Sequence, residues 1–210
     1  LDPQGASSFY FRVKPHAKLK GRKLIAGKQS LKEFVRESDY PGLDLLPAKL
    51  SFRHFDVVLA DAAKPRRQLR ALLKPLAKRY DMLILDAPPT LSLLSENILD
   101  AADTVVTPVV PTSLSANTLD QLVAFLDDSF PGRRPVLIPF FSMVERRKRL
   151  HRDMMCTLRT QHPEILHTTI PYSTDVERMG LARAPLLATR PRCPAGKAFA
   201  ELAAEVMRGL

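Results

Sequence analysis

Short apolar runs alternate with helix-like stretches through the C-terminal two thirds of the chain. The apolar runs cover residues 82–85, 104–110, 136–141 and, more weakly, 167–170. Stretches with the spacing of helices follow them, at about 92–100, 115–129, 145–161, 174–181 and 195–208. Apolar strands that alternate with helices indicate a mostly parallel sheet covered on both faces. The pattern predicts an α/β fold, in which ligands bind beyond the carboxyl ends of the strands.

The first eighty residues have a less regular pattern. Residues 1–28 are polar, with a Lys/Arg-rich stretch from Arg12 to Lys28, and are predicted to be mostly loop. Ser30 can cap a short helix because Glu33 follows three residues later. Residues 43–46 form a short apolar run that suits a strand. Two helices are predicted after it, at 48–61 and 66–79.

Composition places the chain among globular proteins. Its 210 residues are 45% hydrophobic and 26% charged, which suits one domain spanning 1–210. No apolar run approaches the roughly 20 residues that cross a bilayer, and the start of the chain does not read as a signal peptide. The two cysteines show no metal or redox spacing, so we expect a reducing, cytoplasmic setting.

The formal net charge of +10 favours polyanionic partners such as nucleic acid or acidic lipid. A merely solvated basic surface explains the same number. Where the charges lie along the chain therefore distinguishes a polyanion-binding surface from a solvated one.

Asp86 follows the apolar run 82–85 directly, at the predicted end of a buried strand. P-loop NTPases hold magnesium with a carboxylate in this position. The plainer interpretation is a helix cap or a turn aspartate. Ala87-Pro88-Pro89 cannot continue a ladder, because proline lacks the backbone donor.

The segment Tyr80–Pro89 resembles the Walker B segment of the ParA/Soj/MinD family of deviant-Walker P-loop ATPases. Residues 94–115 resemble the helix, strand and loop that follow it in the family. Leu1-Asp2-Pro3-Gln4-Gly5 is similar to the family's second signature, which usually reads Asp-Leu-Asp-Pro-Gln-Gly. The resemblance implies that Asp86 holds magnesium through water, that Asp2 positions the attacking water near the metal, and that Gln4 lies beside it.

The C-terminal part also resembles the family, from Thr169-Ile170-Pro171-Tyr172-Ser173 to the closing helix. Ser142, Met143 and Pro171 stand where the family contacts adenine, although packing roles are the favoured explanation for each of them. The resemblance implies ATP and Mg²⁺ as cofactors.

The family's Gly-rich Walker A loop, Lys-Gly-Gly-x-Gly-Lys-Thr, does not occur in these residues. Such a loop aims backbone N–H groups at phosphate oxygens. We therefore expect an N-terminally truncated ParA-like domain that lacks its first βαβ portion, or a protein that has lost ATP turnover. Truncation is the favoured explanation, because a lost central strand would leave ladder groups unpaired.

The densest run of cations is Val144–Arg152, predicted to be helical. Its candidate DNA-binding residues are Arg146, Arg147, Lys148, Arg149 and Arg152. Leu150, Met154 and Leu158 are expected to share the face that packs on the sheet. The cations can bind DNA phosphates without reading sequence, through release of counterions. The plain alternative is a solvated basic face.

Together these features predict a partition or positioning ATPase. The resemblance implies a homodimer that binds non-specific DNA with ATP, associates with the nucleoid and is stimulated by a ParB-like activator or cargo adaptor, with no membrane attachment. The alternative is a non-enzymatic DNA-binding or adaptor protein that kept the fold. A redox ATPase is disfavoured, because Cys156 and Cys193 are badly placed for a shared cluster.

Overall fold

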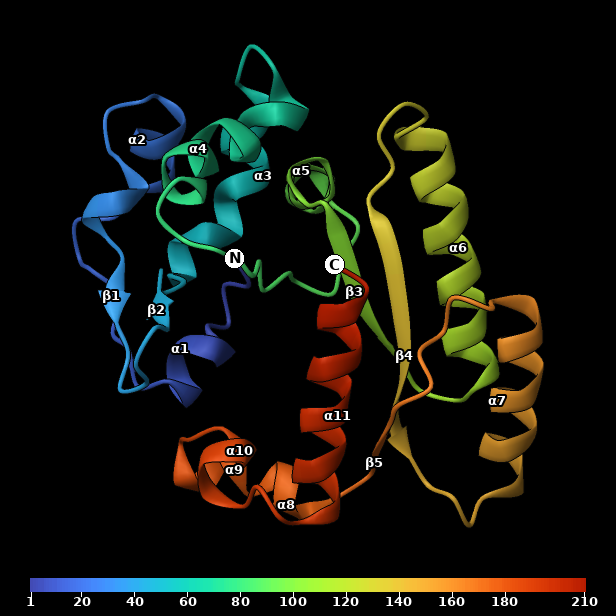
Figure 1. The fold of residues 1–210 in the computed structure, drawn as a ribbon. Coiled ribbons are helices and arrows are strands. Elements are labelled where there is room, and N and C mark those ends of the chain that lie inside the picture. Colours follow the sequence, from blue (N-terminus) through green and yellow to red (C-terminus); the bar gives the residue numbers. More distant parts are fainter. The chain divides into compact units, whose positions relative to one another are not determined.

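A computed structural model describes residues 1–210, the side chain of residue 51 excepted. The chain divides into two compact units, Leu1–Ala102 and Asp103–Leu210 (Figure 1). The expectation of one domain over 1–210 stays a prediction. Among the described residues, no helix combines the length and the apolar character needed to cross a membrane.

Short helices and turns make up the first unit. In chain order its elements are α1 (Ala6–Tyr10), α2 (Gly21–Ile25), η1 (Leu31–Glu33), β1 (Arg36–Glu37), β2 (Asp44–Leu45), η2 (Leu50–His54), α3 (Phe55–Ala60), η3 (Pro65–Arg67), α4 (Gln68–Ala77) and α5 (Leu93–Ala101). The two short strands pair antiparallel, with Arg36 opposite Leu45.

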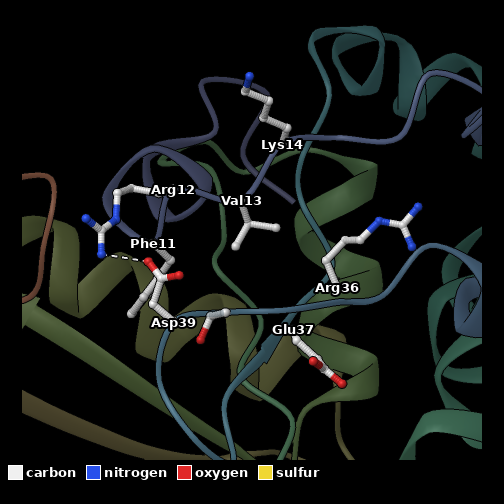
Figure 2. A pocket seen from close by; sticks show the side chains of 8 residues that line it. Phe11, Arg12, Val13, Lys14, Arg36, Glu37 and Asp39 are labelled. Carbon is white, nitrogen blue, oxygen red and sulfur yellow. Dashed lines mark ion pairs between the residues drawn. The ribbon is translucent and has the colours of Figure 1, made fainter.

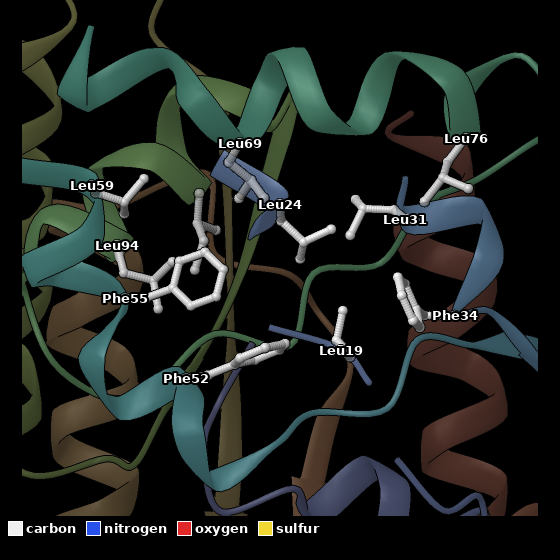
Figure 3. Packing of buried hydrophobic residues seen from close by; sticks show 11 residues of the cluster. Leu19, Leu24, Leu31, Phe34, Phe52, Phe55, Leu59, Leu69, Leu76 and Leu94 are labelled. Carbon is white, nitrogen blue, oxygen red and sulfur yellow. The ribbon is translucent and has the colours of Figure 1, made fainter. Parts of the chain in front are cut away.

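Leucine and phenylalanine side chains from these elements form one buried cluster (Figure 3). Leu19 and Leu24 are 1% exposed, and they anchor the basic stretch that the sequence pattern assigned to loop. The Phe52 and Phe55 rings meet edge to face, with centroids 4.9 Å apart. Burying a side chain of this size contributes about 1.5–3 kcal/mol, so the cluster orders a segment rich in cations.

Asn97 joins three elements of the first unit through hydrogen bonds. Its side chain is fully buried in α5. Its Oδ1 accepts from the backbone N–H groups of Gln68 (3.0 Å) and Leu69 (3.2 Å), at the start of α4. Its Nδ2 donates to the carbonyls of Pro65 (2.7 Å) and Leu93 (2.9 Å). One amide thereby satisfies N-terminal donors of α4 that have no partner inside the helix.

The predicted strand at 82–85 is not part of a ladder, which corrects the sequence interpretation. Residues 82–88 belong to no helix or strand, and alternate side chains face inward: Leu83 and Leu85 pack on the core, whereas Met82 and Ile84 are exposed. No strand among the described residues pairs with this segment. The alternation of burial is typical of a strand, but a paired strand needs a neighbour.

The second unit is a regular α/β arrangement. Its elements are β3 (Thr104–Val109), α6 (Ser113–Ser129), β4 (Val136–Val144), α7 (Arg149–Gln161), β5 (Thr169–Pro171), α8 (Thr174–Glu177), α9 (Met179–Ala182), α10 (Leu186–Thr189) and α11 (Pro194–Arg208). The strands form a parallel sheet in the order β3-β4-β5, as predicted.

Register and packing in this unit follow the apolar pattern. Thr104 lies opposite Val136, and the β3–β4 pairing runs on without a break to Val109 opposite Phe141. Phe141 is fully buried at the centre of the sheet. In Figure 1, α6 and α7 lie on one side of β4 and α11 lies on the other. Ile170 of β5 packs against Ala198 and Leu202 of α11, which covers that face of the sheet.

Candidate functional site

A tight turn begins the first unit and fixes the orientation of Asp2. The Asp2 carboxylate accepts a hydrogen bond from the backbone N–H of Gln4 (Oδ1 to N, 2.9 Å). The Asp2 carbonyl accepts from the N–H of Gly5 at 3.0 Å. Gly5 has a φ of 67°, a left-handed conformation that glycine adopts without strain, and it leads into α1. Gln4 is exposed beside the carboxylate.

Asp86 lies next to this turn although it is far away in sequence. The Asp2 backbone N–H donates to the Asp86 carbonyl at 3.2 Å. The Asp86 carboxylate is exposed and accepts a hydrogen bond from the Ser7 hydroxyl of α1. The structure thus brings together the three residues predicted to be catalytic, and adds Ser7. Only its place just after the Asp-Pro-Gln-Gly turn could have pointed to Ser7.

This group of side chains offers oxygen atoms only. Mg²⁺ is usually bound through one or two carboxylates, with water and substrate phosphates completing its octahedron. Asp2, Asp86 and the Ser7 hydroxyl fit that pattern. Among the described residues no three His, Cys, Asp or Glu side chains form a complete metal site. The donors present would therefore suit a hydrated ion shared with phosphate oxygens.

The residues predicted to contact adenine lie at one end of the second unit's sheet. Phe141 pairs with Thr169 and Val144 pairs with Pro171, and the register shifts between these pairs. Ser142 and Met143 occupy the irregular stretch. Met143 has a φ of 55° and its side chain is half exposed. The three predicted residues therefore sit on neighbouring strands, although their role stays a prediction.

Tyr172 follows Pro171 and is tied back to the sheet. Its backbone N–H donates to the Val144 carbonyl at 3.1 Å, and its hydroxyl donates to Glu177 at 2.7 Å. The hydrogen bond to the Glu177 carboxylate raises the pKa of the Tyr172 phenol, and the negative charge adds to the effect. The phenol therefore stays protonated at neutral pH and holds the turn that follows β5.

The basic segment is a turn followed by a helix, which corrects the predicted start of the helix. Helix α7 begins at Arg149, so Arg146, Arg147 and Lys148 precede it. Lys148 is ion-paired with Glu145, and Arg149 lies 3.5 Å from Asp153. Cations are unfavourable at the positive end of a helix, yet Arg149 and Arg152 stand in the first turn of α7, so the macrodipole does not account for where this helix begins.

Arg146, Arg147 and Arg152 are exposed and form no ion pair within the described chain. We call residues 145–152 the basic turn. Its five predicted DNA-binding residues share one exposed segment. Their binding role stays a prediction.

The inward face of α7 differs from the predicted one. Leu150 is 59% exposed, whereas His151 is 5% exposed and accepts from the Glu145 N–H at its Nδ1 (3.2 Å). Leu158 is buried as expected. Arg159 donates to the His167 carbonyl at 3.0 Å and lies over the Phe141 ring. His151 and Leu158 are seven residues apart and lie about 20° from each other around the helix, whereas Leu150 lies about 80° from Leu158 and so faces solvent.

Two shallow cavities lie outside the predicted site. One, of about 310 Å³, is lined by Arg12, Lys14, Arg36, Glu37 and Asp39 among others (Figure 2). The other, of about 600 Å³, is lined by residues of the second unit that include Arg134 and His162. Neither cavity is lined by Asp2 or Asp86.

Comparison with known sequences identifies relatives of this chain. A family model described as an AAA domain matches residues 1–130. The cell division protein PomZ of Myxococcus xanthus is 30% identical over 150 residues, which are 70% of this chain and 47% of PomZ. The chromosome partitioning protein ParA of Caulobacter vibrioides is 24% identical over 190 residues, covering 88% of this chain and 71% of ParA.

Solved structures share the fold. A variant of Cyanothece McdA in complex with ATP superposes with a TM-score of 0.82 at 18% identity, covering 97% of this chain and 82% of McdA. Further matched structures contain ADP and magnesium. At these identities the likeness establishes the α/β fold alone. It agrees with the fold that the apolar pattern predicts.

Proposed function

Because the chain belongs to the ParA/MinD family of P-loop ATPases, we propose that it is an ATPase that partitions or positions a cargo by binding DNA in its nucleotide-bound, dimeric form. The cargo would be a plasmid, a chromosome or a protein assembly. A ParB-like activator or cargo adaptor would stimulate hydrolysis and so release the DNA.

The observation that carries the proposal is the pairing of Asp2 with Asp86 at the surface of the first unit. The two residues are 84 positions apart, yet a backbone hydrogen bond of 3.2 Å holds them together. The Asp2 side chain is oriented by the Gln4 N–H, and the Asp86 side chain by the Ser7 hydroxyl. Two oriented carboxylates supply the metal-holding and water-positioning parts of a magnesium-dependent phosphoryl-transfer site, to which a phosphate-binding loop has to be added.

We assign roles to these residues accordingly. Asp86 would hold water ligands of the metal, and Asp2 would orient the attacking water, with Gln4 beside it. Magnesium bound with ATP would neutralise charge that develops on the phosphates. Ser142, Met143 and Pro171 would contact the adenine, since they stand on neighbouring strand ends of the second unit.

The basic turn would bind DNA in this scheme. Arg146, Arg147 and Arg152 are exposed and carry charge that no acidic side chain neutralises within the described chain. Lys148 and Arg149 would exchange their ion-pair partners for phosphates. Contacts of this kind position a protein on the duplex without reading its sequence, as nucleoid association requires.

The test is the Asp2→Ala variant of the full-length protein. We expect ATP binding, measured with a fluorescent ATP analogue, to stay within about threefold of the wild type. Hydrolysis, measured as released phosphate, should fall by about 10²-fold or more, because the attacking water loses its orienting group. Asp81→Ala removes an exposed carboxylate from the neighbouring segment and should leave both readouts unchanged.

Unchanged turnover by Asp2→Ala would refute the role of Asp2. A wild-type protein that binds DNA equally well with and without ATP, and hydrolyses none, would instead support the non-enzymatic adaptor. Both measurements use the same preparation, so the two outcomes are distinguishable.

A further inference from the structure

The positive charge of this protein is concentrated in one part of the first unit. Residues 12–36 contain nine Lys and Arg residues and a single acidic one, Glu33, which gives the segment a formal charge of +8 out of the chain's +10. We call these residues the basic surface. The basic turn of the second unit, with five cations and Glu145, has a formal charge of +4, half that of the basic surface.

The cations of the basic surface project into solvent. Eight of them are exposed, and these are Arg12, Lys14, Lys18, Lys20, Arg22, Lys23, Lys28 and Lys32. Within the described chain only Arg12 has an ion-pair partner, Asp39 at 2.6 Å. In Figure 2 the Lys14 and Arg36 side chains extend away from that carboxylate. Cations that are not paired within the protein remain available to an external polyanion.

The segment that carries these cations is held in place by the fold. Leu19, Leu24, Leu31 and Phe34 anchor it in the hydrophobic cluster (Figure 3). The Gln29 side chain closes the loop, donating to the Lys18 carbonyl at 2.9 Å and accepting from the Lys20 N–H at 3.1 Å.

The close contact of Gly21 with Phe55 fixes the loop further. A Cβ at Gly21 would stand 2.7 Å from the Phe55 ring, so the backbone packs tightly there. A fixed array of cations loses little conformational entropy when it meets a fixed array of phosphates.

We infer that the basic surface is a second DNA-binding surface, which contacts the phosphate backbone of duplex DNA without reading bases. This inference rests on the proposed DNA binding and adds a region to it. Anionic lipid fits the surface less well. The large apolar side chains between the cations are buried rather than exposed, and α2 has only five residues, too short for an interfacial helix. Binding to the phosphate backbone of DNA, by contrast, requires only positive charge on the protein.

The test compares four-residue charge removals in the full-length protein with ATP and magnesium. The first variant combines Lys18→Gln, Lys20→Gln, Arg22→Gln and Lys23→Gln. The matched control removes four exposed cations elsewhere in the same unit: Lys64→Gln, Arg67→Gln, Lys74→Gln and Lys78→Gln. Binding to a short duplex of arbitrary sequence is followed by fluorescence anisotropy across a salt titration.

We expect the first variant to bind at least about tenfold more weakly at low salt. Its slope of log affinity against log salt should be shallower by about 3–4, since each lost phosphate contact removes about 0.9. The control should bind within about twofold of the wild type. A variant with Lys18→Arg, Lys20→Arg and Lys23→Arg keeps the charge and should bind like the wild type, which separates charge from folding.

Equal weakening by both charge-removal sets would show an effect of net charge and overturn the inference, and so would wild-type binding by the first variant. In either case the proposed function stands, provided that the wild type binds DNA and hydrolyses ATP. A wild type that binds no duplex would overturn both. Sedimentation with phosphatidylserine-containing vesicles completes the test. If the first variant loses binding to vesicles but keeps binding to DNA, the basic surface binds membranes instead.

Discussion

The first unit joins its short helices with individual polar side chains, whereas the second is built on a hydrogen-bonded ladder. Asn97 alone serves four backbone groups in the first unit. In the second unit, β4 lies between β3 and β5, and both neighbours pair with its backbone. A repetitive apolar pattern therefore predicts paired strands in the second unit. The structure of the irregular first unit depends on single polar residues, which the apolar pattern does not identify.

Phe141 tests how much the packing of the second unit's sheet contributes to stability. Phe141→Ala should lower the free energy of unfolding by about 3–5 kcal/mol, because it leaves a cavity at the centre of the sheet and removes the ring beneath Arg159. Chemical denaturation measures the loss. Leu114→Ala, at a side chain 75% exposed, serves as the control and should change stability by less than about 0.5 kcal/mol.

The next effect tests whether one amide organises the first unit. Asn97→Ala should cost about 3 kcal/mol, because buried backbone groups of Gln68, Leu69 and Pro65 lose their partner. Asn117→Ala, at an exposed position of α6, is the matched change and should be nearly neutral. Hydrogen exchange should show faster exchange in residues 1–102 and little change in β3–β5. Uniform acceleration across both units would contradict the contrast between them.

A pair of glycine substitutions compares tight packing in the two units. A Cβ at Gly196 would stand 2.6 Å from the Arg190 carbonyl oxygen and 2.8 Å from that of Pro191, both backbone atoms. Gly196→Ala should therefore cost about 2 kcal/mol. Gly21→Ala meets the Phe55 ring, a side chain that can rotate, and gains helix propensity, so thermal denaturation should show a smaller loss. The reverse order would mean that the first unit is the more tightly packed.

The smallest effect depends on pH. Burial by itself raises the pKa of the Glu205 carboxyl, but hydrogen bonds from Thr168 and His167 outweigh it and hold the pKa below its usual value. Because the folded pKa is depressed, the stabilisation is present above the unfolded pKa and is lost as the pH falls through the folded one. Glu205→Gln should cost about 1 kcal/mol at pH 7 and much less in acid. A loss that is independent of pH would contradict this interpretation.

The sequence predicted much of the second unit and the pairing of Asp2 with Asp86. Strands β3, β4 and β5 fall on the apolar runs, since burial on both faces of a parallel sheet requires continuous apolar residues. The proximity of Asp2 and Asp86 could be predicted only from the resemblance to a family, because no local sequence pattern links positions so far apart.

The differences from the predicted structure lie in α7 and in two polar side chains. The helix predicted through Arg146–Lys148 begins at Arg149 instead, and local charge does not account for the shift, since Arg149 and Arg152 stand in the first turn themselves. The inward place of His151 follows from its seven-residue spacing to Leu158, because residues eight apart, such as Leu150 and Leu158, diverge by about 80° around a helix. Ser7 and Asn97 act through hydrogen bonds to partners distant in sequence. The Asp-Pro-Gln-Gly turn before Ser7 is the only local signal for it, and Asn97 has none.

Residues 82–88 affect how residues 1–210 must be handled at the bench. Ile84 is 81% exposed there. A large apolar side chain in water favours self-association, so concentrated stocks of residues 1–210 should grow turbid with time, and the charge in Ile84→Lys should keep them clear.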